Sequence, residues 1–423
     1  MATAIVDPDR WATDGTGALS LRMARSIEQA EQLSNSEKHL VTSFHPRFVY
    51  PLFGKEETIY GYEDLDVQLA FNSSTLKNYL SINYKSKLPD SSPIKPDDIE
   101  GTFYKFIPPD YSKSIKEFEQ ELESETSKNF KPPGQKISSY RSSPDQKGKL
   151  KSTHFLDSDQ WVKCHDQKDE EESDVIFELW GANWKTPGFK DYHRRMQILV
   201  LLYIEGGSYI EEDDDRWEFV VLFEKRKLKS VEGNQYSYHF CGYVSLYSFY
   251  HYPSLIRLRL SQFIILPPYQ SAGHGSMLYS EIFQYLLKRE DVAELTIEDP
   301  SESFEDLRDK CDLKMLMKNK VLDTDLNKLV PLDKNWYQET KAKWKLADRQ
   351  FRRLIEMGLR WKFSNLEKPI AKIERLYRIG IKERLYRLVN ISKEERRERL
   401  QATFESVLDD YDRLLRGERI EID

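Results

Sequence analysis

The stretch that decides the fold is SQFIILPPYQSAGHGSMLYSEIFQYL, residues 261–286. A short apolar run ends at two prolines, and Gln270, Gly273 and Gly275 then stand directly before an amphipathic run. An apolar run that stops at prolines indicates a strand, and the run that follows indicates a helix over residues 273–288. Small residues at such a turn leave the first backbone N–H groups of the helix open to an anion. The stretch therefore predicts a phosphate or pyrophosphate site.

A glycine-rich turn alone is a weak signal, because such turns also form plain helix starts. The Walker sequence GxxxxGK[ST] is absent, and a Rossmann fingerprint would need GxGxxG with an acidic residue after the next strand. This chain has QxxGxG instead, and three strand-like runs precede it. The surrounding sequence must therefore identify the ligand.

The three runs are RWEFVVLFEKRK, YSYHFCGYVSLYSFY and LIRLRLSQFIILPP. Turn signals separate them, so they predict an antiparallel meander. After the helix come a short strand, VAELTIED, and the segment SESFEDLRDKCDL, in which Ser301 is suited to cap a helix. Three strands, a helix, a strand and a helix predict an α+β (α/β layered) fold.

The rest of the chain divides by composition. Residues 1–40 are polar, with a short helix predicted near SLRMARSIEQAEQLS. Residues 41–174 form an N-terminal module whose stretch 117–174 is rich in charged residues and serine, and we expect exposed, partly disordered connections there. The core covers residues 175–315, and residues 316–423 are predicted to form charged helices.

Composition narrows the classes of function. The chain of 423 residues has a formal net charge of −7, which disfavours direct binding to nucleic acid. Its longest apolar run, residues 197–204, is too short to span a membrane, and no secretory signal begins the sequence, so we expect an intracellular protein. The three cysteines are widely spaced, and Cys164 beside His165 is typical of an ordinary loop pair, so we expect no metal site.

The block from Arg257 to Asp312, with QFIILPPYQSAGHG and LTIEDPSESFEDLRD, resembles the acetyl-CoA core of the GNAT acetyltransferases. Within them it is similar to the family of type B histone acetyltransferase catalytic subunits. The similarity extends upstream through YIEGGSYIEEDDDRWEFVVLFEK and GYVSLYSFYHYP to FHPRFVYPLFGKEETIYGY, and covers most of residues 44–315. It implies a GNAT core with an N-terminal substrate-recognition module and a C-terminal helical domain.

The resemblance implies acetyl-CoA as co-substrate, with its pantetheine arm along the strand and its pyrophosphate at the glycine turn. For His274 we expect the backbone N–H to matter more than the imidazole. Ser301, which also fits a helix N-cap, is implied to touch the same molecule. The implied cofactor-binding residues are Phe263, Ile264, Ile265, Gln270, Ser271, Ala272, Gly273, His274, Gly275, Ser276 and Ser301.

Acetyl transfer to lysine needs a neutral amine, and deprotonating a lysine near pH 7 costs about 4–5 kcal/mol, so a general base is required. The resemblance carries the family's EDP glutamate onto Glu298, at the exit of the strand after the predicted cofactor helix. Asp299 and Glu205 are candidate supporting acids. The alternative is that Glu298 and Asp299 only precede a helix cap, and that Glu205 lies in an exposed turn.

An acidic groove would suit a basic histone tail. The positions implied to bind it are Lys55, Glu56, Glu57, Tyr247, Ser248 and Phe249. Lys55 departs from the acidic residue expected there. The run EEDDD at residues 211–215 is more typical of a solvated turn, and the aromatic residues at 247–252 are typical of strand cover or of a protein interface.

The resemblance therefore predicts a histone lysine acetyltransferase that acts on lysines near the amino terminus of newly synthesised, free histone H4. It implies a WD-repeat histone chaperone as partner, a cytoplasmic and nuclear location, and no contact with nucleic acid or membrane. Two alternatives stay open. One is a GNAT enzyme that acts on another amine, and the other is a histone-binding scaffold without turnover, against which the intact QxxGxG and Glu298 argue.

Overall fold

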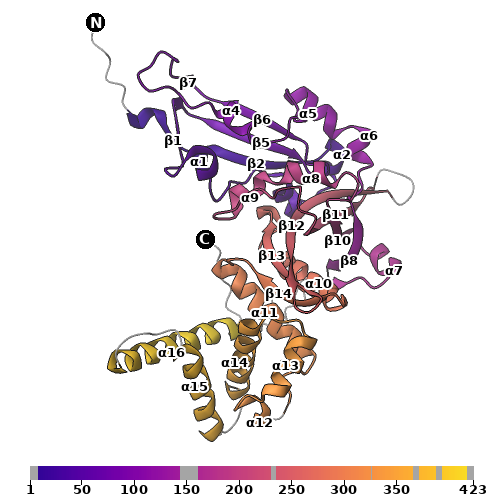
Figure 1. The fold of residues 1–423 in the computed structure, drawn as a ribbon. Helices are drawn as coiled ribbons and strands as arrows, with labels where there is room; N and C mark the ends of the chain where they lie inside the picture. The colour runs from indigo at the N-terminus through magenta and orange to yellow at the C-terminus, as the bar shows by residue number, and fades with distance from the viewer. Residues whose placement is uncertain are drawn as a thin grey trace. The chain divides into compact units, whose positions relative to one another are not determined.

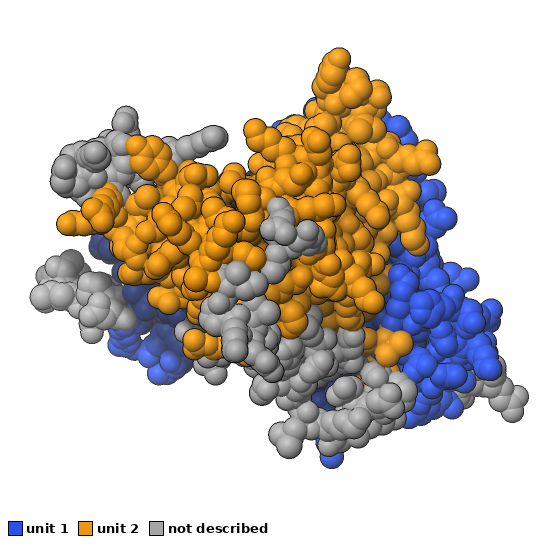
Figure 2. Space-filling view, turned by 90° about the horizontal axis from the view of Figure 1, so that it is seen from below, with its two compact units in different colours: residues 1–141, 163–247, 261–274 blue, residues 142–162, 248–260, 275–423 orange. Residues whose placement is uncertain are grey.

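The structure is a computed structural model that describes residues 8–142, 161–229, 235–324, 326–364, 371–386 and 393–416. The chain divides into two compact units, which Figure 2 shows in different colours. Unit 1 comprises residues 1–141, 163–247 and 261–274, and unit 2 comprises residues 142–162, 248–260 and 275–423. Each unit draws on more than one of the predicted domains, so the predicted domain boundaries stay a prediction.

A seven-stranded sheet has the order β14-β13-β12-β11-β10-β8-β9, and Figure 1 labels most of these strands. The pairs β8–β10, β10–β11 and β11–β12 are antiparallel, whereas β13 and β14 are parallel. The strands are β8 (Gln135–Ser142), β9 (Trp161–Lys163), β10 (Val175–Asn183), β11 (Trp217–Lys227), β12 (Tyr236–His251), β13 (Leu255–Ile265) and β14 (Val292–Ile297). Since β11, β12 and β13 are neighbours in the sheet as predicted, and helices accompany the sheet, the α+β fold is confirmed.

Strand β11 shows why the prediction succeeded. Its residues 219–224 are all buried, and their sequence, FVVLFE, is almost continuously apolar. A strand with neighbours on both sides and cover on both faces loses the alternation of polar and apolar residues. The apolar run therefore indicated a central strand.

Unit 1 also contains a three-stranded sheet of order β2-β5-β6, formed by β2 (Leu19–Ala24), β5 (Asp66–Asn72) and β6 (Asn78–Asn83). The sequence predicted a polar segment with a helix near residues 20–34, and this was wrong for β2. Leu19, Leu21 and Met23 alternate along this strand and are buried, which is the period of a strand and not of a helix. The helix that does form, α2 (Ile27–Glu31), is short and is capped by Ser26.

The charged stretch 117–174 contains more regular structure than predicted. Strand β8 pairs with β10, and Tyr140 of β8 is fully buried. The prediction of exposed connections was therefore wrong for residues 135–142, because their order comes from pairing with a distant strand that the polar sequence QKISSYRS does not reveal. Residues 143–160, on which part of this prediction falls, lie outside the described residues.

Short elements complete unit 1. Its small strands pair as β1–β3 and β4–β7. Two helices, α8 (Phe189–Met196) and α9 (Ile198–Tyr203), precede the acidic run at residues 211–215. The other elements are η1 (Pro8–Trp11), β1 (Ala12–Asp14), α1 (Gly15–Ala18), η2 (Asn35–Val41), α3 (Tyr50–Phe53), β3 (Thr58–Tyr60), β4 (Tyr62–Glu63), β7 (Ser86–Lys87), α4 (Ile99–Phe103), α5 (Ile115–Leu122), α6 (Glu125–Lys128), α7 (Gln167–Glu171) and η4 (Pro267–Tyr269).

Unit 2 is mainly helical, and Figure 1 shows its C-terminal helices gathered beside α11. Buried aspartates of α11 pair with arginines of later helices, Asp306 with Arg413 and Asp309 with Arg353, each at 2.6 Å. These ion pairs hold charged helices together where the sequence shows few apolar residues. The helices are α10 (His274–Leu287), α11 (Glu302–Lys318), α12 (Leu326–Leu329), α13 (Lys334–Lys343), α14 (Asp348–Ser364), α15 (Ala371–Tyr386) and α16 (Lys393–Leu415), and the first residue of α10 belongs to unit 1.

Two properties of the described residues bear on the class of protein. None of the helices in this part of the chain combines the length and the apolar character that crossing a membrane requires. Within the same residues, no group of three or more His, Cys, Asp and Glu side chains could hold a metal ion.

Candidate active site

The glycine turn lies in unit 1, directly after β13. The side-chain amide of Gln270 folds back and donates a hydrogen bond of 2.7 Å to the backbone oxygen of Ile265. Ser271 and Gly273 have φ angles of 57° and 85°, and α10 begins at His274. Such left-handed backbone suits glycine best, so Gly273 is required for the shape of the turn. Among the predicted pyrophosphate residues 270–276, Gln270, Ser271 and Ser276 are exposed.

His274 directs its imidazole into the interior of unit 1. Its Nδ1 lies 3.0 Å from the hydroxyl oxygen of Tyr140, and the centroid of its ring lies 4.2 Å from that of Phe177. Burial lowers the pKa of His274 to about 4, so the ring is neutral near pH 7. The imidazole therefore supports the turn from inside, and a role for the backbone N–H of His274 stays a prediction.

A buried ion pair holds the residue that precedes the turn. The hydroxyl of Tyr269 donates to Oε2 of Glu224 at 2.7 Å, and Arg25 donates to both oxygens of Glu224 at 3.2 and 2.9 Å. Burial alone would raise the pKa of Glu224, but the nearby charges, above all that of Arg25, outweigh it and hold this pKa well below its usual range. Sequence reasoning missed this network because Arg25 and Glu224 lie 199 positions apart.

The end of β13 is packed closely against β12. A Cβ atom on Gly242 would lie 2.1 Å from the backbone oxygen of Ile264, so this approach requires glycine. One residue earlier, the backbone oxygen of Cys241 accepts a hydrogen bond of 2.9 Å from the N–H of Leu266. The side chains of Ile264 and Ile265 are buried, so a ligand along this strand would meet backbone groups there.

In unit 2, Glu298 follows β14 and remains attached to β13. Its backbone N–H donates a hydrogen bond of 2.9 Å to the oxygen of Leu260. Its carboxylate lies 3.6 Å from Nη1 of Arg259, and 43% of its side chain is exposed. The guanidinium of Arg259 also lies over the ring of Phe249, 4.4 Å from the centroid. The structure thus brings together one predicted catalytic and one predicted substrate-binding residue through Arg259.

Sequence reasoning missed Arg259, although a signal was available. Arg257 and Arg259 alternate along β13, and Glu294 and Glu298 lie four positions apart near β14. Residues spaced by two and by four share one face of a strand. Because β13 and β14 pair in parallel, oppositely charged residues with this spacing can meet, and Arg257 does pair with Glu294 at 2.5 Å.

The residues after Glu298 begin helix α11. Asp299 is exposed and has a φ angle of 33°, a strained value for a residue other than glycine. Ser301 is the N-cap of α11, as predicted, and its hydroxyl accepts a hydrogen bond of 3.4 Å from the N–H of Phe304. Capping is therefore confirmed for Ser301, while its contact with a cofactor stays a prediction.

The predicted tail-binding segment 55–57 lies in unit 1, shortly after α3, and α3 contacts the turn that contains Glu205. The hydroxyl of Tyr50 accepts a hydrogen bond of 2.6 Å from the N–H of Gly206, which joins the two segments. The carboxylate of Glu57 accepts hydrogen bonds from backbone N–H groups at the start of α3, including that of Tyr50 at 3.0 Å. Glu57 thus shapes the segment, whereas the side chains of Lys55, Glu56 and Glu205 are exposed.

Tyr247 faces the acidic loop of unit 1. Its hydroxyl donates to Oδ2 of Asp214 at 2.8 Å, and the guanidinium of Arg216 lies 4.7 Å from the centroid of its ring. A hydrogen bond from Arg216 is the main cause that lowers the pKa of Asp214. Ser248 follows in unit 2 and is half-buried. Asp214 of the EEDDD run thus forms hydrogen bonds with the side chains of Tyr247 and Arg216, so this run is not only solvated.

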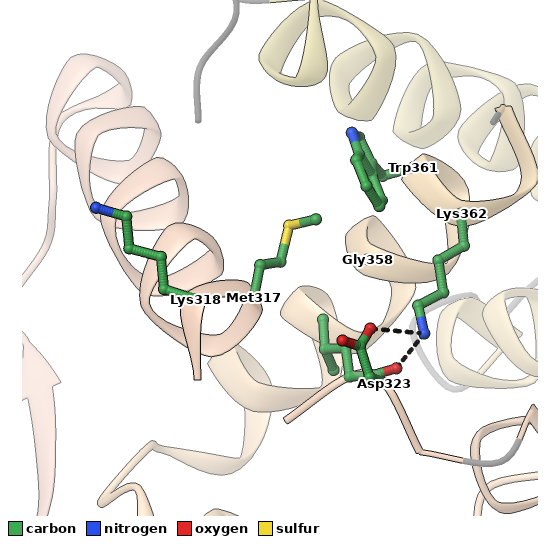
Figure 3. Close-up of a pocket in the computed structure, with 7 residues that line it drawn as sticks. Met317, Lys318, Asp323, Gly358, Trp361 and Lys362 are labelled. Carbon is green, nitrogen blue, oxygen red and sulfur yellow. Dashed lines mark hydrogen bonds and ion pairs between the residues drawn. The ribbon is translucent and has the colours of Figure 1, made fainter. Parts of the chain in front are cut away.

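A pocket of about 270 Å³ lies elsewhere in unit 2, between the end of α11 and α14. Figure 3 shows Met317 and Trp361 on two sides of it, and the ion pair of 3.4 Å between Lys362 and Asp323. It shares no residue with the predicted acetyl-transfer site. A Cβ on Gly358 would lie 2.3 Å from Cδ1 of Leu322, so a larger residue there would require the Leu322 side chain to move.

Comparisons with known proteins agree with this architecture. Residues 11–205 match the family model described as "Histone acetyl transferase HAT1 N-terminus", and residues 309–364 match the model "Fungal HAT1, C-terminal". A relative from Cryptococcus neoformans var. neoformans serotype D is 46% identical over 96% of this chain and 98% of its own length. Relatives from Mycosarcoma maydis and Candida albicans are 37% and 34% identical, over 95% and 98% of this chain and 88% and 92% of their own lengths. All three are named histone acetyltransferase type B catalytic subunit.

These matches define the class of protein as an acetyl-transferring enzyme. More narrowly, the chain belongs to the family of histone acetyltransferase type B catalytic subunits, because its similarity to the named relatives extends over nearly its whole length.

Proposed function

We propose that this chain transfers the acetyl group of acetyl-CoA to lysine side chains near the amino terminus of newly synthesised, free histone H4. The names of its relatives support a histone as acceptor. The main support for the site comes from β13. The backbone oxygen of Leu260 in this strand accepts a hydrogen bond from the N–H of Glu298, and the chain continues from the end of the strand into the glycine turn before α10. On this proposal, residues 175–315, from β10 into α11, form a GNAT core. The segment before it recognises the substrate, and the segment after it forms a helical domain.

Acetyl-CoA supplies the acetyl group as an activated thioester. The turn fits its pyrophosphate because residues 270–276 are small or polar, and because the imidazole of His274 is directed inward and leaves the outer side to the ligand. The backbone of Phe263, Ile264 and Ile265 would hold the pantetheine arm. A backbone N–H near Ile264 or Ile265 would donate to the thioester oxygen as it gains negative charge. Ser301 would contact the same molecule from the start of α11.

Glu298 acts as the general base in this proposal. Its carboxylate is half-exposed and stands at the end of a strand, so an arriving lysine can reach it. Removing the proton from the ammonium near pH 7 costs about 4–5 kcal/mol without help, which is why a carboxylate must lie beside it. Asp299 and Glu205 would stabilise the ammonium before it loses the proton. The neutral lysine amine then attacks the thioester carbonyl directly, and no acyl-enzyme forms. The C–S bond breaks, and the departing coenzyme A thiolate takes up the proton that the amine loses as it becomes an amide.

The acceptor peptide would lie along two groups of residues, each described within its own unit. Glu56 and Glu205 are exposed acids on adjoining segments of unit 1, where Glu57 keeps the first segment in place, and Lys55 would border the same contact. Tyr247, Ser248 and Phe249 would contact the chain around the target lysine. We further propose a WD-repeat histone chaperone as partner and action in cytoplasm and nucleus.

The test is acetylation of a panel of acceptors with acetyl-CoA, read by site mapping in a mass spectrometer. The panel holds an H4 amino-terminal peptide, the same peptide with its lysines replaced by arginine, an H3 tail peptide and a small primary amine. Modification of H4 lysines only supports the proposal. Modification of the peptide's α-amino group or of the small amine would favour another GNAT substrate, and binding of acetyl-CoA without any product would favour a scaffold.

A further inference from the structure

Lys345 lies beyond the predicted core, between α13 and α14, yet it contacts two elements of the candidate active site in unit 2. Its ammonium donates a hydrogen bond of 3.0 Å to the backbone oxygen of Leu286 in α10, and it also donates to the backbone oxygen of Arg289 just after this helix. Its own backbone oxygen accepts a hydrogen bond of 3.0 Å from the N–H of Leu295 in β14. Lys345 therefore joins the helix that follows the glycine turn to the strand that leads to Glu298.

The side chain and the backbone of Lys345 have separate partners. The last carbonyl groups of a helix lack partners within it, and their negative partial charge attracts an ammonium, which explains the position of the side chain at the end of α10. The backbone contact continues at the next residue, since Leu346 forms a parallel bridge with Leu295. Because β14 stands at one end of the sheet order, this segment pairs with the outer edge of the strand. A change of the Lys345 side chain therefore acts on α10 and leaves the pairing with β14 in place.

A second attachment holds the first half of α10. The hydroxyl of Tyr279 donates a hydrogen bond of 2.9 Å to Oδ1 of Asp312 in α11, and the side-chain amide of Gln350 in α14 donates one of 2.9 Å to Oδ2 of the same carboxylate. All three side chains are buried. A helix that is held at one point can still turn about it, whereas a helix held at two points along its axis cannot. Tyr279 and Lys345 together thus fix the direction of α10, and with it the position of the N–H groups at its start.

We propose that Lys345 is a positioning residue for acetyl-CoA, which fixes the direction of α10 so that the N–H groups at its start meet the pyrophosphate. This inference rests on the proposed function, and it concerns binding of the cofactor and not the chemical step. Donor groups that are already held in place need no ordering when the ligand arrives, so less of the binding free energy is lost. The segment after the predicted core thus contributes to the affinity for acetyl-CoA without touching it.

The test replaces Lys345 by methionine in the full chain and measures the Kd for acetyl-CoA by calorimetry. Methionine keeps an apolar stem and removes the ammonium. The Kd is expected to rise by about three- to tenfold, because ordering α10 then takes up part of the binding free energy. With an H4 peptide as acceptor, the KM for acetyl-CoA should rise likewise, whereas kcat at saturating acetyl-CoA and the KM for the peptide should stay within about twofold of the wild type. The matched control is Lys343→Met, which removes an exposed lysine of α13 and should leave the Kd unchanged.

A folded Lys345→Met variant with the Kd of the wild type would overturn this inference alone, because binding by the wild type would still support the cofactor. A fall in kcat without a change in the Kd would overturn it as well. Should Lys345→Met not fold by circular dichroism, Lys345→Gln, which has a shorter and uncharged side chain, takes its place and is judged by the same Kd. A wild type that does not bind acetyl-CoA would overturn both the proposed function and this inference.

Discussion

Replacing Arg25 by leucine should destabilise the region beneath the glycine turn by removing one half of a buried ion pair. The side chains of Arg25 and Glu224 are each only 1% exposed. In Arg25→Leu, the Glu224 carboxylate loses both hydrogen bonds from Arg25 but keeps those from Tyr269 and from Arg226, the latter at 2.7 Å. The carboxylate thus remains buried with part of its compensation.

Breaking a buried ion pair typically costs about 3–5 kcal/mol, and the remaining contacts of Glu224 place this case near the lower end, at about 3 kcal/mol. For a unit of this size, about 3 kcal/mol corresponds to a decrease in Tm of about 6–12 °C. Replacing both partners by leucine leaves no unpaired charge at the two positions. Arg226 would still pair with Glu37 at 2.7 Å. The double variant should therefore be more stable than Arg25→Leu alone.

The assay is urea unfolding followed by circular dichroism for the wild type, both single variants and the double variant. Because the chain has two compact units that can unfold separately, each transition is fitted on its own. The KM for acetyl-CoA is measured alongside, since Tyr269 joins this network to the turn and Arg25→Leu should raise it. Additive losses in the double variant would refute the reasoning, because they would show that the two charges do not compensate each other.

Three further predictions concern the turn and its neighbours. His274 has a folded-state pKa of about 4, below the ordinary value near 6.5, so its contribution to the unfolding free energy is complete above pH 6.5 and is lost as the pH falls towards 4. In His274→Gln, the unfolding free energy should therefore depend less on pH over that range, by up to about 3 kcal/mol. Gly273→Val places a branched side chain at a φ of 85° and should raise the KM for acetyl-CoA at least tenfold, whereas Gly380→Val in α15 should not. Ser301→Ala removes the cap of α11 and should cost about 1 kcal/mol in urea unfolding.

Local signals in the sequence predicted the central part of the fold. The helix predicted over residues 273–288 is observed as His274–Leu287, because the glycine turn sets its start and the apolar period its length. The cap at Ser301 followed from a rule that involves only its next three residues. Such features depend on neighbours in the chain, and the sequence contains those neighbours.

Features that depend on distant partners were not predictable in the same way. Strand β8 owes its place to pairing with β10, and its sequence alone is that of a polar loop. The network of Arg25, Glu224 and Tyr269 joins three segments whose proximity only the fold creates. Arg259 was missed for another reason, since its alternation with Arg257 was visible but was interpreted only as strand pattern.

The most direct test of the central claim is the single-turnover rate of acetyl transfer to an H4 peptide by Glu298→Gln. The control is Glu294→Gln, which alters a carboxylate on β14, the strand before Glu298, where Glu294 pairs with Arg257. The account predicts that Glu298→Gln binds acetyl-CoA normally but transfers acetyl at least 100-fold more slowly near pH 7, in the range of about 10²–10⁴ typical of a lost general base, and that its rate recovers as rising pH supplies neutral lysine. Glu294→Gln should react at the wild-type rate. Equal rates for the wild type and Glu298→Gln across this pH range would contradict the account.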